Sequence, residues 1–340
     1  MSERQSAYMS VRIEDLTELV EAALLRSGLA ARSGVMIAQA IVAAEIDGCR
    51  SHGIYRVPGY ANSLASGWVD GNAAPVVEDV AAGLVRVDAR DGFAQVALSQ
   101  ASALLAEKAA RVGVAAMAVR NSHHFAALWQ DIEPFAERGF VALNMVNSRS
   151  RMVIWNGRRK VLGTNPIAFA CPRTGRSPIC WDQATSVMSH GDVLLRAAAG
   201  IALPPGVGLD AQGLDTTDAD AVAHGGALLP FGGVKGGSIA FMVEVFAAAL
   251  TGANFGFQDD SASFPGAQTS RAGQFILLVD PSTIAGDDFA GRMETLIETI
   301  RLAGASRIPS EHRHQHRAAV RRAGKVEVDE ASYRALLRHA

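Results

Sequence analysis

The chain has 340 residues and a formal net charge of −2; 49% of its residues are hydrophobic and 6% are aromatic. This length is enough for two domains with buried cores, and the near-neutral charge and few aromatic residues argue against a nucleic-acid partner. Three isolated cysteines without C-x-x-C spacing, an N-terminus without a signal-peptide pattern and no apolar run long enough for a bilayer predict a cytoplasmic protein without membrane contact.

The N-terminal part is predicted to be helical. Apolar residues recur at helical spacing in 13–28 and 36–48, and each segment ends at glycine, which is common just past the C-terminus of a helix. A third helix is predicted over 53–67, with Pro58 in its early turns, where the missing N–H matters least.

From residue 84 onward, strand and helix patterns are mixed. The predicted strands lie at 84–89, 114–121, 140–148, 165–172, 177–182 and 273–280. The predicted helices lie at 95–112, 125–138, 186–200, 237–252, 286–303 and 328–339. The run 201–226, rich in Gly, Asp and Pro, is predicted to be a long loop. These elements indicate an α/β or α+β fold, and their spacing leaves the pairing of the strands open.

Several common enzyme motifs are absent. No G-x-G-x-x-G follows a predicted strand, and FGGVKGGS (231–238) has neither that spacing nor the ending of a P-loop. H-E-x-x-H and G-x-S-x-G are also missing. The sequence is therefore not predicted to be a Rossmann enzyme, an NTPase, a zinc protease or an α/β-hydrolase.

The segment GCRSHGIYRVPGY (48–60) contains Ser51, His52 and Arg56. An imidazole that gives a proton, beside a guanidinium that binds a carboxylate with two N–H groups, suits a small 2-oxo or 2-imino acid. Asp192, in DQATSVMSHGDV (182–193), is the carboxylate that we expect to pair with His52 and fix its tautomer. The alternative makes Ser51 a helix N-cap and leaves His52 and Arg56 as solvated surface residues.

Two segments near predicted strands are candidates for ligand contacts. RNSHHFAALWQD (120–131) opens a predicted helix, where free N–H groups favour a phosphate or carboxylate. The alternative is that Asn121 and Ser122 cap this helix and one histidine is buried. LGTNPIAFACP (162–172) is either the rim of a site or an ordinary turn before a strand.

Two Gly-rich or basic segments are further candidates. PFGGVKGGS (230–238) lets backbone approach a ligand beside Lys235, or is a flexible loop. SRIPSEHRHQHR (306–317) has three alternating histidines, but the interleaved arginines oppose a divalent metal. A nucleotide phosphate suits this segment better, and the alternative is a solvated basic loop.

The order of these motifs resembles the malate/L-lactate dehydrogenase-like family of NAD(P)-dependent oxidoreductases, which lacks a Rossmann fold. The resemblance runs from about residue 13 to about 325 and rests on S-H-G-x-x-R, N-S-x-H-F, L-G-T-N-P, D-x-A-T-S with a later H-G-D, L-P-x-G-G-x-K-G and R-x-P. Segments such as NSHHFAALW and ATSVMSHGDV resemble its branch of Δ1-piperideine-2-carboxylate/Δ1-pyrroline-2-carboxylate reductases.

The resemblance implies a mixed α/β (α+β) homodimer. A helical domain would be formed by 1–80 and completed by 281–340, and a non-Rossmann NADPH-binding and substrate domain with a largely antiparallel sheet would span 81–280. The implied activity is NADPH-dependent reduction of cyclic imino acids to L-pipecolate and L-proline. The alternative is a 2-hydroxy acid dehydrogenase of the malate or lactate type.

The resemblance also implies roles for individual residues, without a metal. The implied catalytic residues are Ser51, His52 as proton donor, and Asp192, and the implied substrate contacts are Arg56, Thr164, His190 and Gly191. The implied cofactor contacts are His123, His124, Phe125, Ala126, Ala127, Asp182, Gln183, Ala184, Val234, Lys235, Arg307 and Arg313. Arg307 and Arg313 are the candidates for a 2′-phosphate, because guanidinium binds phosphate with paired N–H groups. Ile154, Trp155 and the arginines after them depart from the small turn expected there.

Overall fold

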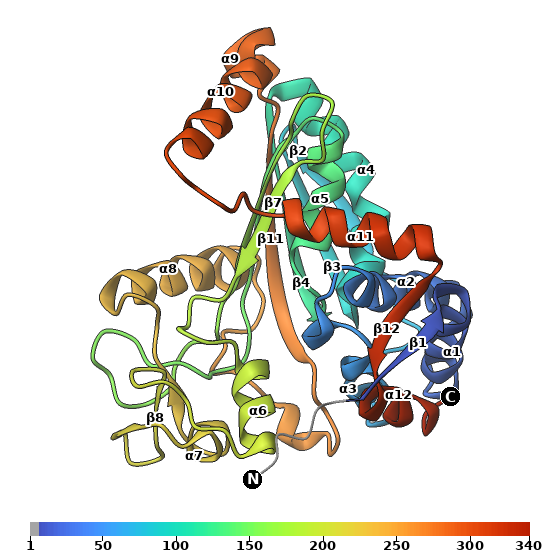
Figure 1. Cartoon of the computed structure of the whole chain (residues 1–340), viewed down its shortest axis with the longest axis vertical. Coiled ribbons are helices and arrows are strands. Elements are labelled where there is room, and N and C mark those ends of the chain that lie inside the picture. Colours follow the sequence, from blue (N-terminus) through green and yellow to red (C-terminus); the bar gives the residue numbers. More distant parts are fainter. Residues whose placement is uncertain (1–6) are drawn as a thin grey trace.

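A seven-stranded sheet forms the centre of the molecule (Figure 1). The computed structural model describes residues 7–340. Across the sheet the strands are β2 (Val76–Ala81), β3 (Leu84–Phe93), β4 (Val114–His124), β11 (Ser270–Val279), β5 (Val141–Val146), β6 (Ile167–Cys171) and β7 (Ile179–Gln183). Every neighbouring pair is antiparallel except β3 and β4. The expected mixed α/β fold with a largely antiparallel sheet is confirmed.

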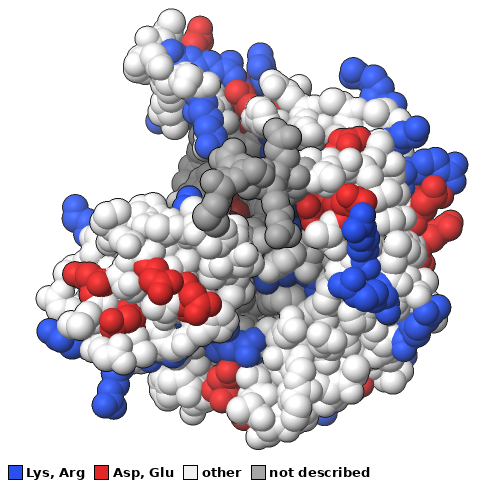
Figure 2. Space-filling model, turned by 60° about the horizontal axis from the view of Figure 1, so that its bottom comes forward, with Lys and Arg blue, Asp and Glu red and all other residues white. Residues whose placement is uncertain are grey.

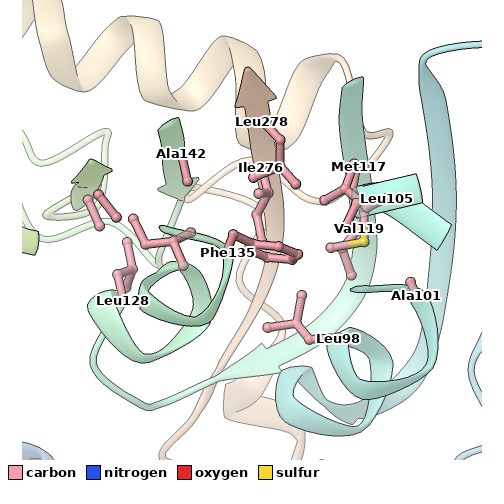
Figure 3. Packing of buried hydrophobic residues seen from close by; sticks show 14 of the residues in the cluster. Leu98, Ala101, Leu105, Met117, Val119, Leu128, Phe135, Ala142, Ile276 and Leu278 are labelled. Carbon is pink, nitrogen blue, oxygen red and sulfur yellow. The ribbon is translucent and has the colours of Figure 1, made fainter. Parts of the chain in front are cut away.

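Two helices cover one face of this sheet. α4 (Ala94–Val112) is the crossover that the parallel pair β3–β4 requires, and α5 (Trp129–Glu137) lies beside it. Because side chains alternate along a strand, Ile276 and Leu278 of β11 both point to these helices, as Figure 3 shows. Each such fully buried aliphatic side chain stabilises the fold by roughly 1.5–3 kcal/mol.

The opposite face of the sheet is covered by α8 (Val234–Glu244), which continues into one wider turn, η3 (Val245–Ala249). Val243 and Ala247 pack there against Met145 and Phe275 from the strands. Both faces of the sheet are thus mostly apolar, and the polar side chains that line the cleft come mainly from its ends.

The two chain ends meet in a helical region beside the sheet. β1 (Tyr8–Arg12) pairs antiparallel with β12 (Lys325–Asp329), and α12 (Glu330–Leu337) packs with the helices of the N-terminal part. Those helices are α1 (Ile13–Arg26), α2 (Ala31–Ile46) and α3 (Val57–Ala65). One apolar cluster contains Leu16 from the start of the chain and Leu336 from its end.

A smaller lobe lies below α8 in Figure 1. It has a three-stranded sheet and two helices: β8 (Gly208–Leu209), β9 (Asp215–Thr216), β10 (Ala227–Leu228), α6 (His190–Ala199) and α7 (Ala219–Ala223). Leu203, Val207 and Val222 are buried in its own apolar cluster. The prediction of a long loop over 201–226 is therefore wrong, because this segment folds into two-residue strands and a short helix whose patterns are too brief to read.

The C-terminal part contains a helix that the sequence patterns missed. α11 (Glu311–Ala323) spans most of the segment expected to be a basic loop, and none of its residues is buried. It is held by ion pairs instead of an apolar stripe, so hydrophobic periodicity gave no signal. α10 (Phe289–Leu302) lies at the far end of the sheet from α12, so 281–340 divides between two regions of the molecule (Figure 1). In the part described, no helix has the length and apolar character of a membrane span.

Candidate active site

A cleft of about 690 Å³ lies between the helical region, one end of the sheet and the small lobe. Figure 2 shows the molecule from the side of the hollow between the lobes, with Lys and Arg side chains in it and on its rim. The predicted residues that line the cleft are Ser51, His52, Arg56, Thr164, Asp182, Gln183, Ala184, His190, Gly191, Asp192, His124, Phe125 and Ala126. Residues as far apart in the chain as Ser51 and Ser270 thus contribute to one cavity.

His52 lies on a tight double turn that follows α2, formed by η1 (Arg50–His52) and η2 (Ile54–Arg56). The turn rests on Glu45, whose Oε1 accepts a hydrogen bond from the backbone N–H of Ile54 at 2.8 Å. A Cβ on Gly53 would lie 2.0 Å from that oxygen, so only glycine lets the turn sit this close to the carboxyl group. The Gly in S-H-G therefore has a structural reason, which is to place Ser51 and His52 in the cleft.

The His52 imidazole is neutral in this cleft. Burial, together with the smaller effects of the positive charges of Arg56 and His124, lowers its pKa to about 3. Its Nδ1 lies 3.1 Å from Ser51 Oγ, which leaves Nε2 available to a ligand. Without a bound anion, this residue holds no spare proton at neutral pH.

Arg56 is fixed in position and has no counter-ion in the described part of the chain. Its Nε donates to the backbone oxygen of Ser51 at 2.6 Å, and its guanidinium lies 4.6 Å from the ring centroid of Phe125. Among residues 7–340, no carboxylate lies within ion-pair distance of it, and burial lowers its pKa. A Cβ on Gly191 would lie 3.1 Å from its Nη2, so the glycine of H-G-D leaves room for this side chain. Such a guanidinium is suited to bind a ligand carboxylate.

Asp192 lines the cleft but does not pair with His52. Its Oδ2 accepts from Ser189 Oγ at 2.7 Å, and its backbone N–H donates to the same hydroxyl at 3.0 Å. This is the N-terminal cap of α6, which satisfies a free N–H and keeps the carboxylate at the start of the helix. The expected hydrogen bond between Asp192 and His52 is absent among the described residues, although the Asp192 charge acts on Arg56.

Thr164 lies in a turn that Glu244 stabilises through hydrogen bonds with the neighbouring side chains. Glu244 accepts from the Asn165 side chain at 2.6 Å and from Asn147 at 3.2 Å, and burial raises its pKa. Asn165 has a left-handed backbone with a φ of 33°, which Asn tolerates better than most residues. The L-G-T-N-P motif thus builds a rigid rim, and Thr164 faces the cleft from it.

The H-H-F segment places its two histidines differently. Because it continues strand β4, consecutive side chains point to opposite sides. His123 is fully buried, with Nδ1 2.9 Å from Thr269 Oγ1, whereas His124 lines the cleft. Ala127 is also fully buried, so the side chains of His123 and Ala127 do not reach the cleft as was expected of cofactor contacts.

The remaining expected cofactor residues lie outside the main cleft. Arg307 lines an adjoining pocket of about 350 Å³ with Trp181 and Pro309, which shares Asp182 and Gln183 with the cleft. Val234 lines a separate pocket of about 300 Å³ with Ile154 and Trp155, the residues that depart from the family pattern. Lys235 is exposed at the start of α8 and lines neither pocket.

Arg313 is already engaged by the protein. Its Nη2 donates to the backbone oxygen of Cys180 at 3.1 Å, and its guanidinium lies 4.6 Å from the Trp129 ring centroid. It also lies within 3.9 Å of Asp47 and 3.7 Å of Glu133. This network ties α11 to α2 and α5, so Arg313 has a structural role and is not free to bind a phosphate.

Sequence reasoning missed three residues of the site. Arg149 and Arg151 line the cleft, and no ion pair or hydrogen bond of the Arg151 side chain is found among residues 7–340. The pKa of His190 is lowered to about 3, mainly by burial, and the charges of Arg151 and Arg149 contribute to this shift. Asp131, on α5, bonds to His124. The signal for the arginines was present in NSRSR, which follows a predicted strand; Asp131 had none beyond its place at a helix start.

Glu45 makes the stability of the protein depend on pH. Burial raises its pKa from the ordinary value of 4.5 to about 7, so this group stabilises the fold fully below pH 4.5 and the contribution is lost as pH rises through 7. The loss amounts to about 3 kcal/mol, because one pKa unit is about 1.4 kcal/mol. We expect Glu45→Gln, which keeps the acceptor for Ile54, to be more stable than the parent at pH 8 by up to this amount.

Urea unfolding of both proteins at pH 5 and pH 8 measures this difference. Glu107→Gln, at an exposed position of α4, is the matched control and should follow the parent at both pH values. If the stability difference between Glu45→Gln and the parent is the same at both pH values, Glu45 does not titrate in this range.

Comparison with known proteins places the whole chain in one group. A family model described as malate/L-lactate dehydrogenase matches residues 11–337. The Δ1-pyrroline-2-carboxylate/Δ1-piperideine-2-carboxylate reductase of Pseudomonas putida is 48% identical over 319 residues, which are 94% of each chain. The (2R)-3-sulfolactate dehydrogenase (NADP(+)) of Chromohalobacter salexigens is 37% identical, and the match covers 89% of this chain and 90% of that protein.

A solved structure agrees with these relatives. The Δ1-piperideine-2-carboxylate reductase of Pseudomonas syringae pv. tomato superposes with a TM-score of 0.94 at 48% identity, covering 98% of this chain and all of that one. At this similarity the arrangement of sheet, helical region and small lobe is shared, and with it the position of the cleft.

Proposed function

The chain belongs to the malate/L-lactate dehydrogenase family, and from this premise we propose that it is an NADPH-dependent reductase of cyclic imino acids. The proposed reactions convert Δ1-piperideine-2-carboxylate to L-pipecolate and Δ1-pyrroline-2-carboxylate to L-proline. The two cyclic imines are the substrates in the names of the 48% identical relatives. One observation of the structure carries the proposal: Arg56, which has no counter-ion within residues 7–340, lies in the same cleft as a neutral His52.

The size and lining of the cavities fit a dinucleotide together with a small acid. The cleft of about 690 Å³ and the pocket of about 350 Å³ adjoin through Asp182 and Gln183. Ala126 and Ala184 line the cleft with small side chains, which leave space for a ligand. Arg307 places a positive charge in the adjoining pocket. We propose that these residues hold NADPH, which when bound supplies the hydride for the C=N carbon.

The residues of the cleft position the substrate. Arg56 would bind the substrate carboxylate with two N–H groups, and Thr164 would orient it from the opposite rim. His52, held at Nδ1 by Ser51, would present Nε2 to the substrate nitrogen or oxygen. For Asp192 the role in a relay with His52 stays a proposal, supported by its place in the same cleft. His190 and Gly191 would border the substrate beside Arg56.

NADPH oxidation with a panel of substrates tests this function. We expect turnover with both cyclic imines, and much lower kcat/KM with pyruvate and oxaloacetate. A specific observation keeps the second candidate, a 2-hydroxy acid dehydrogenase, in the panel: Arg149 and Arg151 add cations that suit a second carboxylate. Faster turnover of oxaloacetate than of either imine would favour that candidate.

The choice of NADPH over NADH is tested at Arg307. Replacing Arg307 by alanine should raise the KM for NADPH roughly 10- to 100-fold, the value of one charge-assisted contact, and leave the KM for NADH unchanged. Initial rates with each nucleotide measure this split. Arg292→Ala, at an exposed position of α10, is the matched control. Equal changes with both nucleotides would show that Arg307 does not bind the 2′-phosphate.

We also propose a homodimer in the cytoplasm. Exposed Phe241 and Met242 on α8 lie beside Trp155, which favours burial of this face by a second chain. The three cysteines are free, which suits a reducing compartment. Sedimentation equilibrium should give twice the mass of one chain, and a monomer would remove this part of the proposal.

A further inference from the structure

A buried histidine–carboxylate pair borders the cleft on the side of the sheet. His124 Nε2 lies 2.7 Å from Asp131 Oδ2, and the two side chains are only 4% and 5% exposed. His124 ends strand β4 and Asp131 lies in the first turn of α5, so two rigid elements hold the pair. His124 itself lines the cleft, which puts one edge of its ring within reach of a ligand.

Asp131 is held in place by amide donors from the sheet. The same oxygen, Oδ2, accepts from Asn144 Nδ2 at 3.0 Å and from Gln274 Nε2 at 2.8 Å. Gln274 also donates to Asn144 Oδ1 at 3.0 Å, which fixes the direction of both amides. Three donors thus converge on one carboxylate oxygen in the first turn of α5, which fixes the orientation of the carboxylate.

This arrangement determines which nitrogen of His124 is available. Because Asp131 is an acceptor only, Nε2 must carry the proton and donate it. No hydrogen bond of Nδ1 is found among residues 7–340, so Nδ1 is the nitrogen left for a ligand in the cleft. With Nε2 bonded to Asp131, Nδ1 is the nitrogen that can exchange a proton with a ligand.

The other histidines of the cleft differ from His124. His52 and His190 have pKa values lowered to about 3, and neither bonds a carboxylate in the described chain. His224 bonds Asp220, but that side chain is 65% exposed on the small lobe. His124 is therefore, among the described residues, the buried histidine of the cleft that has a buried carboxylate partner.

The ionisable groups around His124 come from several elements: Asp131 on α5, Asp182 on β7, His52 on η1, Arg56 on η2 and Tyr60 on α3. Asp131 bonds His124 directly, whereas Asp182 and Arg56 line the same cleft. His52 is neutral, and the pKa of Tyr60 is raised to about 12 by burial, so neither adds charge near pH 7. On β11, Arg271 points away over the Trp68 ring.

We propose that His124 is a second catalytic residue, which delivers the proton to the substrate nitrogen, and that Asp131 is its positioning residue. This rests on the proposed function. As the hydride from NADPH joins the C=N carbon, the π electron pair moves to nitrogen. That pair takes the proton from His124 Nδ1, so that one N–H bond breaks and one forms and His124 is left neutral. The product amine and NADP⁺ leave, and solvent returns the proton.

The first test is the pH profile of kcat/KM with a cyclic imine. We expect the parent to lose activity on the alkaline side. Asp131→Asn should move this limb to lower pH, because the adjacent carboxylate is removed, and should keep near-parent activity on the acid side. Asp220→Asn, which changes the exposed pair of the small lobe, is the control and should leave the limb in place. A limb at the same pH in Asp131→Asn, with or without lower activity, would overturn the proposal.

His124→Gln tests the proposal independently, also if Asp131→Asn does not fold. It should lower kcat by roughly 10²- to 10⁴-fold, the usual share of proton transfer, and abolish the alkaline limb assigned to His124. Retention of the limb would exclude His124 as the donor.

A measurement on the protein without substrate or nucleotide separates this inference from the proposed function. Nitrogen-15 NMR of the protein without nucleotide follows the protonation of His124 directly. We expect the His124 ring to remain an imidazolium to higher pH than His52, and to lose that proton at lower pH in Asp131→Asn. If no imine is turned over but this shift occurs, the substrate assignment fails and the charged pair stands. If the NMR titration of His124 does not respond to Asp131→Asn, the pair does not act as proposed, whatever the substrate.

Discussion

Replacing Arg56 by leucine is expected to lower kcat/KM for a cyclic imino acid by about 10³-fold, because removing one partner of a desolvated charge pair costs roughly 3–5 kcal/mol. Leucine keeps much of the packing against Phe125 and removes the guanidinium that we assign to the substrate carboxylate. Most of the loss should appear in KM, since the carboxylate is bound in both the ground state and the transition state. Steady-state rates with NADPH saturating measure it.

Arg50→Leu is the matched control for this prediction. Arg50 lies six positions away on η1, but it is exposed and bonds Tyr8 Oη at 3.0 Å on the outside of the turn. Its replacement should leave kcat/KM within about twofold, the range of an exposed site without a ligand contact. If Arg50→Leu and Arg56→Leu lose activity equally, the turn as a whole matters and Arg56 has no special role in binding.

Replacing His52 by alanine is expected to affect ketone and imine reduction unequally. A ketone needs a proton at oxygen as charge builds there, so its reduction should fall by roughly 10²- to 10⁴-fold. A cyclic imine has a basic nitrogen that can bind already protonated or take its proton from His124, so its reduction should fall by less than about tenfold.

The measurement compares kcat for a cyclic imine and for pyruvate in the parent and in His52→Ala. His312→Ala, at an exposed position of α11, controls for loss of a histidine elsewhere and should change neither rate. Equal losses with both substrates would remove the distinction between the two chemistries and make His52 the general proton donor.

The site was predicted by motifs whose residues are separated in the chain and adjacent in space. Ser51, His52, Arg56, Thr164 and Asp192 lie in one cleft, as the resemblance implied. The pairing of Asp192 with His52 was not found, because a carboxylate three residues after Ser189 closes the helix cap locally. The sequence thus predicted which residues share the cleft, but it did not predict which side chain each of them bonds.

The His124–Asp131 pair could not be predicted from its pattern. The two residues are seven positions apart, across the end of a strand and the start of a helix, and neither hydrophobic period places them in contact. Of the two neighbouring histidines, strand alternation sends one inside and one to the cleft, but the sequence does not say which. The register of β4 against β11, where Ser270 opposes His124, decides it.

Elements with apolar periodicity were predicted well, and those held by charge were not. The expected helix at 95–112 and the expected strand at 273–280 agree closely with α4 and β11. α11 escaped because its contacts are ion pairs, such as Arg317 Nε with Asp47 Oδ1 at 2.6 Å. These pairs hold Glu133 as an anion and lower its pKa to about 2, and they depend on partners about 180 to 270 positions away.

The most direct test of the account is the fate of the transferred hydrogen. NADPH deuterated at the transferring position of the nicotinamide is incubated with Δ1-pyrroline-2-carboxylate, and the proline formed is analysed by mass spectrometry and NMR. The account predicts L-proline with one deuterium at C2, and a strong decrease in this product with Arg56→Leu. Proline without deuterium, or no product from either cyclic imine while oxaloacetate is reduced, would contradict it.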